Sequence, residues 1–446
     1  MCNRSIALET LEQAWASAQQ VDHTVAAAAA REAAAGHGLA AAEARRLPNV
    51  SLTAGYTRLQ SEPAAAITIP ALHINGLPFA QDEAYSAAVS FSAPLFTAGR
   101  ISNGIAAAGA MTDAARAASA LSRQELKLAV AEAYVTVLRA QRLNGVAVSH
   151  VTAIARHADD VEQLYRQGYA ARHDVLASQV ALADARQQAL QAANGVALAG
   201  AAYNRLLGRA QDAPTELAEL NEAAEPPATG AAPAPGALAA AGTAPAGTEA
   251  GMPAIAGKGH DLASMIAAGR ARRSELDQLG AQETALRRQS DSVAAQRAPQ
   301  VGLNGGWGKL QNRYLVEDKG WWIGVALKWD LFDGGQLRRE SAQLASNARA
   351  VAELRADAAD KIELQVRQAW LRWQEAGARI DVARAALAQA DETLDLSRER
   401  YRAGLAPNSE VLDAETRRAG AYANRDNAWY DRALARLRLQ YASGSL

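Results

Sequence analysis

Four short stretches of the chain alternate apolar and polar residues, which is the pattern of β-strands with two different faces. The clearest covers residues 50–56, Val-Ser-Leu-Thr-Ala-Gly-Tyr. Similar stretches cover 87–92 and 322–329, and the weakest covers 301–307. We therefore predict strands over about 48–60, 84–95, 299–312 and 321–332, arranged as two hairpins.

A very long helical pattern follows each predicted hairpin. In the second half of the chain an apolar residue recurs every seven positions, at Trp373, Ile380, Leu387, Leu394 and Tyr401. Sustained seven-residue spacing is typical of coiled-coil packing. We expect helices over about 100–165 and 336–401, each on the order of 100 Å long at about 1.5 Å per residue. A glycine turn and a returning helix, over 174–207 and 410–441, complete two antiparallel helical hairpins.

The same unit occurs twice in the chain. Leu95-Phe96 recurs as Leu331-Phe332, and the motif 165–168 recurs as 401–404, both at an offset of 236 positions. A helix precedes each strand pair, over about 8–46 and 262–297. The first hairpin loop is the longer one because of a Pro/Ala-rich stretch at 62–82. The chain therefore contains two structural repeats, 1–208 and 259–446.

Residues 209–258, between the repeats, are rich in Ala, Pro and Gly. Such a composition buries too little apolar surface to fold, so we predict a disordered linker. Its central part, about 222–257, should be dispensable for assembly.

Composition excludes several classes of function. The 446 residues carry a formal charge of −1, without the basic excess of a nucleic-acid-binding surface. Much of the 49% apolar content is alanine, with only 4 Phe and 4 Met, which favours closely packed helices over a large globular core. The seven histidines lack metal-ligand spacing, and no phosphate loop or nucleophile–base pair is present. We expect no cofactor, no metal site and no enzymatic activity.

The membrane signals are indirect. No apolar run reaches 18 residues, so we expect no transmembrane helix, and no signal peptide is visible. Taken alone, these features favour the cytosol unless the N-terminus is a trimmed one. Membrane contact would have to come from strands or from a lipid. The single cysteine, Cys2, is either an ordinary residue after Met1 or the lipid-bearing first residue of a mature lipoprotein.

The duplicated order of helix, strand pair and very long helical hairpin resembles the TolC-type outer-membrane efflux proteins. The resemblance covers nearly the whole chain except the linker, and the motifs that carry it are Leu11-Glu12-Gln13-Ala14, Leu47-Pro48, 94–99, 330–335, 165–168, Asp174-Val175-Leu176, 401–404 and 410–414. It implies a mainly α-helical fold with a membrane β-barrel portion. Three subunits would close a twelve-stranded barrel in outer-membrane lipid and continue as an α-helical tunnel across the periplasm. Physical reasoning agrees that oligomerisation is required, because four strands are too few to close a barrel and open edges cannot span lipid.

The resemblance also implies a function. Such proteins serve as passive exit ducts of tripartite efflux pumps or type I secretion systems, joined through a periplasmic adaptor to an inner-membrane transporter. The adaptor is expected to dock on the hairpin tips around Gly168 and Gly404. The alternative is a soluble coiled-coil scaffold or a periplasmic adaptor without a pore, which the amphipathic strand pairs disfavour.

Glu410 and Asp413 are candidate entrance residues. They lie three positions apart and hence on one helix face, which for most such pairs is a solvated surface. By resemblance they point into the tunnel entrance, where three subunits would form two carboxylate rings and a cation-selective constriction. Tyr401 and Asp174 match positions that hold neighbouring hairpins together, although Tyr401 also fits a heptad core. Ala406 stands where the resemblance would place a gate arginine, so that salt bridge is not expected.

Aromatic residues gather in the predicted strand regions. Tyr, Trp and Phe often mark the edges of a membrane barrel, but they also pack within ordinary sheets. Both interpretations stay open for the residues concerned, which are Tyr56, Trp307, Trp321, Trp322 and Trp329.

Overall fold

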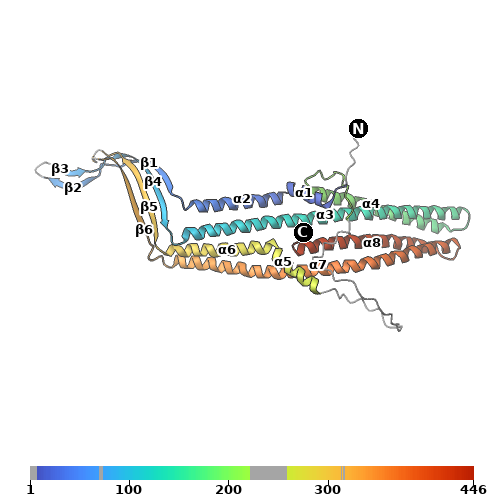
Figure 1. The fold of residues 1–446 in the computed structure, drawn as a ribbon. Coiled ribbons are helices and arrows are strands. Elements are labelled where there is room, and N and C mark those ends of the chain that lie inside the picture. The colour runs from blue at the N-terminus through green and yellow to red at the C-terminus, as the bar shows by residue number, and fades with distance from the viewer. Residues whose placement is uncertain (1–7, 70–73, 221–258, 313, 315–316) are drawn as a thin grey trace. The chain divides into compact units, whose positions relative to one another are not determined.

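A computed structural model describes residues 8–69, 74–220, 259–312, 314 and 317–446 (Figure 1). The chain divides into two compact units. Unit 1 comprises 1–26, 121–273 and 359–446, and unit 2 comprises 27–120 and 274–358. Segments far apart in the sequence therefore build each unit, and each unit contains parts of both repeats.

Unit 2 contains a four-stranded antiparallel sheet. Its strands are β1 (Asn49–Arg58), β4 (Glu83–Phe96), β5 (Gln300–Leu310) and β6 (Lys319–Lys328), in the order β1-β4-β5-β6. They lie where the alternating patterns predicted them. A second hairpin, β2 (Ala64–Ile69) paired with β3 (Ile74–Pro78), occupies the stretch that we predicted as a loop. Alanine and proline disfavour strands, so no strand pattern is visible in this stretch of the sequence.

Long helices form the rest of the described chain (Figure 1). The helical hairpins are α3 (Arg100–Arg166) with α4 (Arg172–Leu206), and α7 (Gln336–Arg402) with α8 (Asn408–Ala442). These bounds confirm the predicted pairs of one very long and one shorter helix. All five heptad positions named above are covered. Ile380 and Leu394 are buried, and Trp373, Leu387 and Tyr401 are half-buried. The seven-residue pattern therefore does mark the covered side of α7.

The first helix of each repeat is broken, where we predicted a continuous one. In the first repeat α1 (Leu11–Val21) and α2 (His23–Ala44) flank Asp22, and in the second α5 (Gly259–Arg272) and α6 (Ser274–Ala294) flank Arg273. A short 3₁₀ turn, η2 (Ala295–Arg297), follows α6. Asp22 has an extended backbone, and its carboxylate accepts hydrogen bonds from the amides of Thr24 and Val25 at 2.8 and 2.9 Å. It thus caps α2 and ends α1 at the same point.

Backbone geometry confirms the repeat. The N–H of Tyr169 donates to the carbonyl of Leu164, and the N–H of Leu405 donates to that of Arg400, both at 2.8 Å. Gly168 and Gly404, one position earlier, have φ of +84° and +71°. These are Schellman caps, which end helices on a left-handed glycine. The same arrangement closes α4 and α8 at Gly208 and Gly444, with φ of +65° and +71°.

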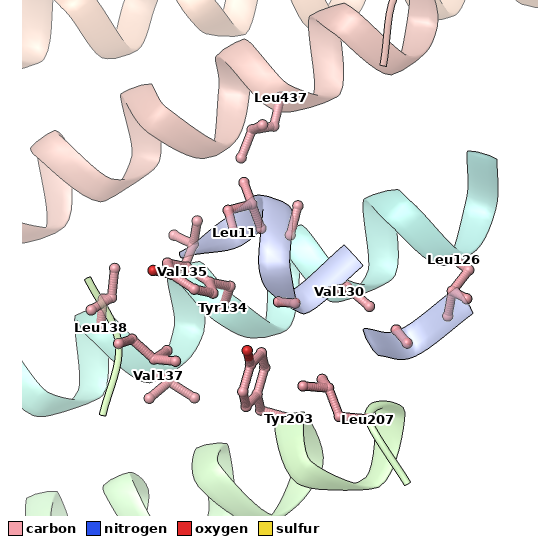
Figure 2. Packing of buried hydrophobic residues seen from close by; sticks show 14 of the residues in the cluster. Leu11, Leu126, Val130, Tyr134, Val135, Val137, Leu138, Tyr203, Leu207 and Leu437 are labelled. Atoms are coloured by element: carbon pink, nitrogen blue, oxygen red, sulfur yellow. The ribbon is translucent and has the colours of Figure 1, made fainter. Parts of the chain in front are cut away.

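The main apolar core of unit 1 lies between α1, α3, α4 and α8. Figure 2 shows Leu11 of α1 near Tyr134 of α3 and Leu437 of α8, with Tyr203 of α4 on the other side of α3. The Tyr134 hydroxyl lies 2.8 Å from the carbonyl oxygen of Glu9 and 2.6 Å from that of Ala218. Burial, followed by the charge of Glu9, raises the pKa of Tyr134 to about 12.

The prediction of a disordered linker over 209–258 was wrong at its beginning. Residues 209–220 pack on unit 1, where Leu217 is buried and the amide of Ala218 donates to the carbonyl of Glu9 at 2.9 Å. Arg209 donates to both carboxylate oxygens of Glu9, and Arg142 to Glu219. These polar contacts hold a segment whose composition alone offers little apolar surface. Residues 221–258 lie outside the described part of the chain.

Candidate functional site

One face of the four-stranded sheet is polar. Directly opposed residues of an antiparallel pair share a face. Across the sheet, Asn49 opposes Ser92 and Ser92 opposes Asn304, and two residues further along β1 Ser51 opposes Ser90. The hydroxyl oxygens of Ser51 and Ser90 are 2.9 Å apart, which places both side chains on this face. Small and hydrogen-bonding side chains of this kind suit a wall that faces water.

The other face is apolar and uncovered. Tyr56 opposes Tyr85 there, and their ring centroids are 4.9 Å apart. Leu52 is 74% exposed and Val325 is 66% exposed. The large side chains of this face with high exposure are Val50, Leu52, Tyr56, Tyr85, Val89, Trp307, Trp321, Ile323, Val325 and Leu327. Leaving such side chains in water costs about 1.5–3 kcal/mol each, and soluble monomers rarely expose so large a contiguous patch.

The aromatic residues divide between the two faces. Trp307 and Trp321 oppose each other on the apolar face, whereas Trp322 opposes Gly306 on the polar face. Trp329 lies beyond β6, and its indole N–H donates to the carbonyl of Arg297 at 3.1 Å. Tyr56, Trp307 and Trp321 lie on the apolar face, as aromatic residues at the edge of a membrane barrel would. Trp322 lies on the opposite face and does not fit that interpretation.

Glycines explain why β5 gave the weakest strand pattern. Gly305 opposes Phe91, and a Cβ atom at Gly305 would lie 2.4 Å from a ring carbon of Phe91. The ring therefore lies across the glycine, and a larger residue would displace it. Glycine breaks the alternating pattern in the sequence while it preserves the apolar face in the fold.

Both outer strands of the sheet have an unpaired edge. Within the part of the chain that the structure describes, β1 pairs only with β4, and β6 pairs only with β5. Each is a 10-residue strand, so each presents a row of backbone donors and acceptors without a strand partner. An open edge of this kind must be covered or paired before it can enter an apolar medium.

The tips of the two helical hairpins form a second candidate site, in unit 1. The tip turns carry Tyr169, which is 82% exposed, and Leu405, which is 72% exposed. Each follows the tip glycine, Gly168 or Gly404, by one position. Gly168 and Gly404 were the predicted docking residues. Tyr169 and Leu405, beside them, are the exposed side chains that a partner could contact.

A buried polar network joins the tips, and no pattern in the sequence predicts it. Asn408, the first residue of α8, is 1% exposed, and its amide group donates to the carbonyl of Asp174 and to the hydroxyl of Ser178, both at 3.0 Å. Its carbonyl oxygen lies 2.6 Å from Nε2 of His157. Because both Asn408 N–H groups are used, Nε2 of His157 is the donor of that bond. We call these four residues the tip clasp. It links α8 to both helices of the first hairpin.

Tyr401 and Asp174 lie beside the tip clasp. The Tyr401 ring packs edge-on against His157 with centroids 5.8 Å apart, and its buried hydroxyl has no hydrogen-bond partner among the described residues. Burial, followed by the charge of Asp174, raises the pKa of Tyr401. Asp174 accepts a hydrogen bond from the amide of Ala171 at 3.3 Å and lies 3.3 Å from Nε2 of His173. Within one chain, Tyr401 therefore acts as a core residue and has no bond to a carboxylate.

Glu410 and Asp413 lie on the first turns of α8, three positions apart. Glu410 accepts a hydrogen bond from Arg400 of α7 at 3.2 Å, whereas Asp413 is exposed and has no ion-pair partner among the described residues. Arg400, ten positions before Glu410 and across the turn, was not among the predicted entrance residues. The two acids are therefore unequal, because Arg400 partly neutralises Glu410.

Two features are absent from the described residues. No helix there is both long and apolar enough to cross a membrane. The same residues contain no group of three or more His, Cys, Asp or Glu placed to hold a metal ion. Cys2 lies outside the described residues.

Comparison with known proteins identifies the family. The family profile described as outer membrane efflux protein matches residues 15–209 and 266–445. The chain belongs to the outer membrane efflux protein family. It is therefore an efflux channel protein of the outer membrane that extends into the periplasm, and it is not an enzyme. A search of curated protein sequences finds no match.

Solved structures of outer-membrane channels share the fold. The outer membrane protein VceC from Vibrio cholerae has a TM-score of 0.77 at 18% identity, over 97% of this chain and 96% of its own. CusC has a TM-score of 0.79 at 16% identity, over 98% and 92%. The CmeC outer membrane channel from Campylobacter jejuni has a TM-score of 0.76 at 13% identity, over 98% and 85%. Efflux proteins of this family work with periplasmic adaptors and inner-membrane transporters, typically as homotrimers.

Proposed function

We propose that three copies of this chain form a passive channel through the outer membrane and the periplasm. The observation that carries this proposal is the two-faced sheet, polar on one side and apolar and uncovered on the other. Twelve strands from three subunits would close a barrel with the apolar face toward lipid and the polar face toward a water-filled lumen. Closure would also pair each β1 edge with a β6 edge of a neighbouring subunit.

The helical hairpins would continue the barrel as a tunnel toward the inner membrane. The exit duct needs no energy source of its own, because an inner-membrane transporter supplies the energy. A periplasmic adaptor would join the two by docking on the hairpin tips around Gly168 and Gly404, where Tyr169 and Leu405 offer exposed apolar contacts. The duct would serve a tripartite efflux pump or a type I secretion system.

At the tunnel entrance, Glu410 and Asp413 would form the constriction. Three subunits would bring six carboxylates together, which attracts cations and disfavours anions. Since Glu410 is bonded to Arg400, Asp413 would supply the larger part of the free negative charge. Tyr401 and Asp174 would act as gate contacts, with the Tyr401 ring packed against His157 of its own subunit and the Asp174 carboxylate bonding across to a neighbouring hairpin.

Lipidation of Cys2 would add an anchor to the membrane beside the barrel. It is not needed for insertion if the barrel forms. The alternative function is a soluble scaffold or adaptor without a pore. The uncovered apolar sheet face disfavours it, because such a face promotes aggregation in water.

The test is the mass and conductance of the purified full-length chain. In detergent we expect a particle of three chains, and in planar bilayers we expect stepwise conductance. A monodisperse monomer with native circular dichroism and no conductance would contradict the proposal.

A further inference from the structure

We propose that the polar face of the sheet, at its junction with the helices, carries a binding site for organic anions that bear sulfonate, carboxylate or phosphate groups. The proposal rests on the proposed function, because it takes the polar face to line the lumen. It adds a site of opposite charge to the acidic residues Glu410 and Asp413.

The site is an open cavity of about 780 Å³ within unit 2. The end of α2, the first turn of α3 and all four strands of the sheet line it. Three cationic side chains, Arg45, Arg100 and Lys328, are among its lining residues, together with the amide of Asn304. Cations and amide donors converging on one cavity are the groups that recognise an oxyanion.

The cationic charge in the cavity is poorly compensated. Neither Arg45 nor Arg100 has an acidic side chain within ion-pair distance in the part of the chain that the structure describes. The Nε of Arg100 donates to the side-chain oxygen of Gln300 at 3.3 Å, which orients the guanidinium without neutralising it. Lys328 has a weak partner, since its Nζ lies 3.6 Å from an oxygen of the exposed Asp330.

The position of Arg100 is unfavourable for helix stability. It is the first residue of α3, a 67-residue helix with no acidic residue in its first turn. The positive end of the helix dipole repels a cation there. The equivalent position of the second repeat holds the neutral Gln336. Arg45 follows the C-terminus of α2, where a cation stabilises the helix. Arg100 does not stabilise its helix in this way, and it adds to the positive potential of the cavity.

Apolar groups at the cavity indicate the size of the anion. Pro48, Pro94 and Ile101 also line it. An anion with an organic body would contact these residues while its charged group meets the arginines. A small inorganic anion would gain only the screened charge interaction in so open a cavity. The site therefore fits amphipathic organic anions better than chloride or phosphate alone.

The experiment measures binding of pyranine, a fluorescent trisulfonate, to the full-length protein in nanodiscs of zwitterionic lipid, by fluorescence anisotropy. We expect saturable binding that weakens with salt. Arg45→Gln with Arg100→Gln should weaken it by about tenfold or more, equivalent to about 1.4 kcal/mol. Arg46→Gln removes the same charge from the next position, which does not line the cavity, and should change binding by less than about twofold. If the double variant fails to fold, Arg45→Gln alone is measured in its place and should weaken pyranine binding by a smaller factor.

The outcomes separate this site from the channel itself. Equal binding by wild type and the double variant would overturn the site. Competition by phosphatidylglycerol added to the nanodiscs would also overturn it, because the cavity would then face lipid. Channel conductance is measured on the same variants. Normal conductance without pyranine binding contradicts only the anion site, whereas absence of conductance in the wild type contradicts the proposed function.

Discussion

The tip clasp should hold the two helical hairpins together, and Asn408→Ala tests this. Asn408 makes three contacts of 2.6–3.0 Å with His157, Ser178 and the carbonyl of Asp174. The substitution leaves the Nε2–H of His157 without its partner. The fully buried Ser178 loses the hydrogen bond from Asn408 and keeps only its own bond to the carbonyl of Asp174 at 2.8 Å. A buried polar group without a partner costs about 1–3 kcal/mol. With two groups affected, and water entering near the tip, we expect a loss of about 3 kcal/mol in local stability.

Hydrogen exchange of the full-length protein is the assay. A loss of about 3 kcal/mol corresponds to roughly 100-fold faster exchange wherever local opening controls the rate. Peptides that cover 155–178 and 400–412 should show it, while the core around Tyr134 should not. The matched control is Asn424→Ala, an exposed asparagine of the same helix. Unchanged exchange at both tips in Asn408→Ala would refute the clasp as a link between the hairpins.

Three further predictions concern the entrance, the core and the strand-to-helix turn. Asp413→Asn should weaken cation selectivity and block by divalent cations more than Glu410→Gln does, because Arg400 already neutralises part of Glu410; equal effects in single-channel recordings would contradict this. The raised pKa of Tyr134, about 12 against 10.0 for the free phenol, means that the folded chain keeps this proton longer than the unfolded chain. Stability should therefore be complete below pH 10 and fall as the pH rises toward 12, and Tyr134→Phe should flatten that slope in thermal melts; an unchanged slope would show that other groups cause it. Ala98 has φ of +47°, where the second repeat uses Gly334, so Ala98→Gly should stabilise the protein by about 0.5 kcal/mol, and a lower melting temperature would contradict the strain.

The sequence predicted the elements whose signal is repeated or periodic. The strand alternation, the seven-residue spacing around Leu394 and the 236-residue offset each extend over many residues, so single exceptions do not hide them. The break at Asp22 was missed because one capping side chain ends one helix and starts the next inside an alanine-rich stretch that favours helix throughout. The order of residues 209–220 was missed because polar contacts to Glu9 and Arg142, distant in sequence, replace the apolar surface that composition lacks.

The candidate site was predictable only where chemistry is local. Glu410 and Asp413 share a helix face, and this spacing is visible in the sequence. The tip clasp joins His157 to Asn408, 251 positions away, and no spacing rule connects them. The apolar sheet face was partly hidden at Gly305, where the ring of Phe91 supplies the apolar surface from the neighbouring strand.

Cysteine accessibility tests the central claim that the two sheet faces meet water and lipid respectively. In a Cys2→Ser background, Thr53→Cys and Ser90→Cys place single thiols on the polar face, and Leu52→Cys and Val325→Cys place them on the apolar face. A membrane-impermeant anionic thiol reagent is added to each variant while it conducts in a planar bilayer. We predict that the polar-face variants react and lose current, and that the apolar-face variants do neither. Equal reaction of the two sets, or reaction of the apolar-face set alone, would contradict a channel lined by the polar face.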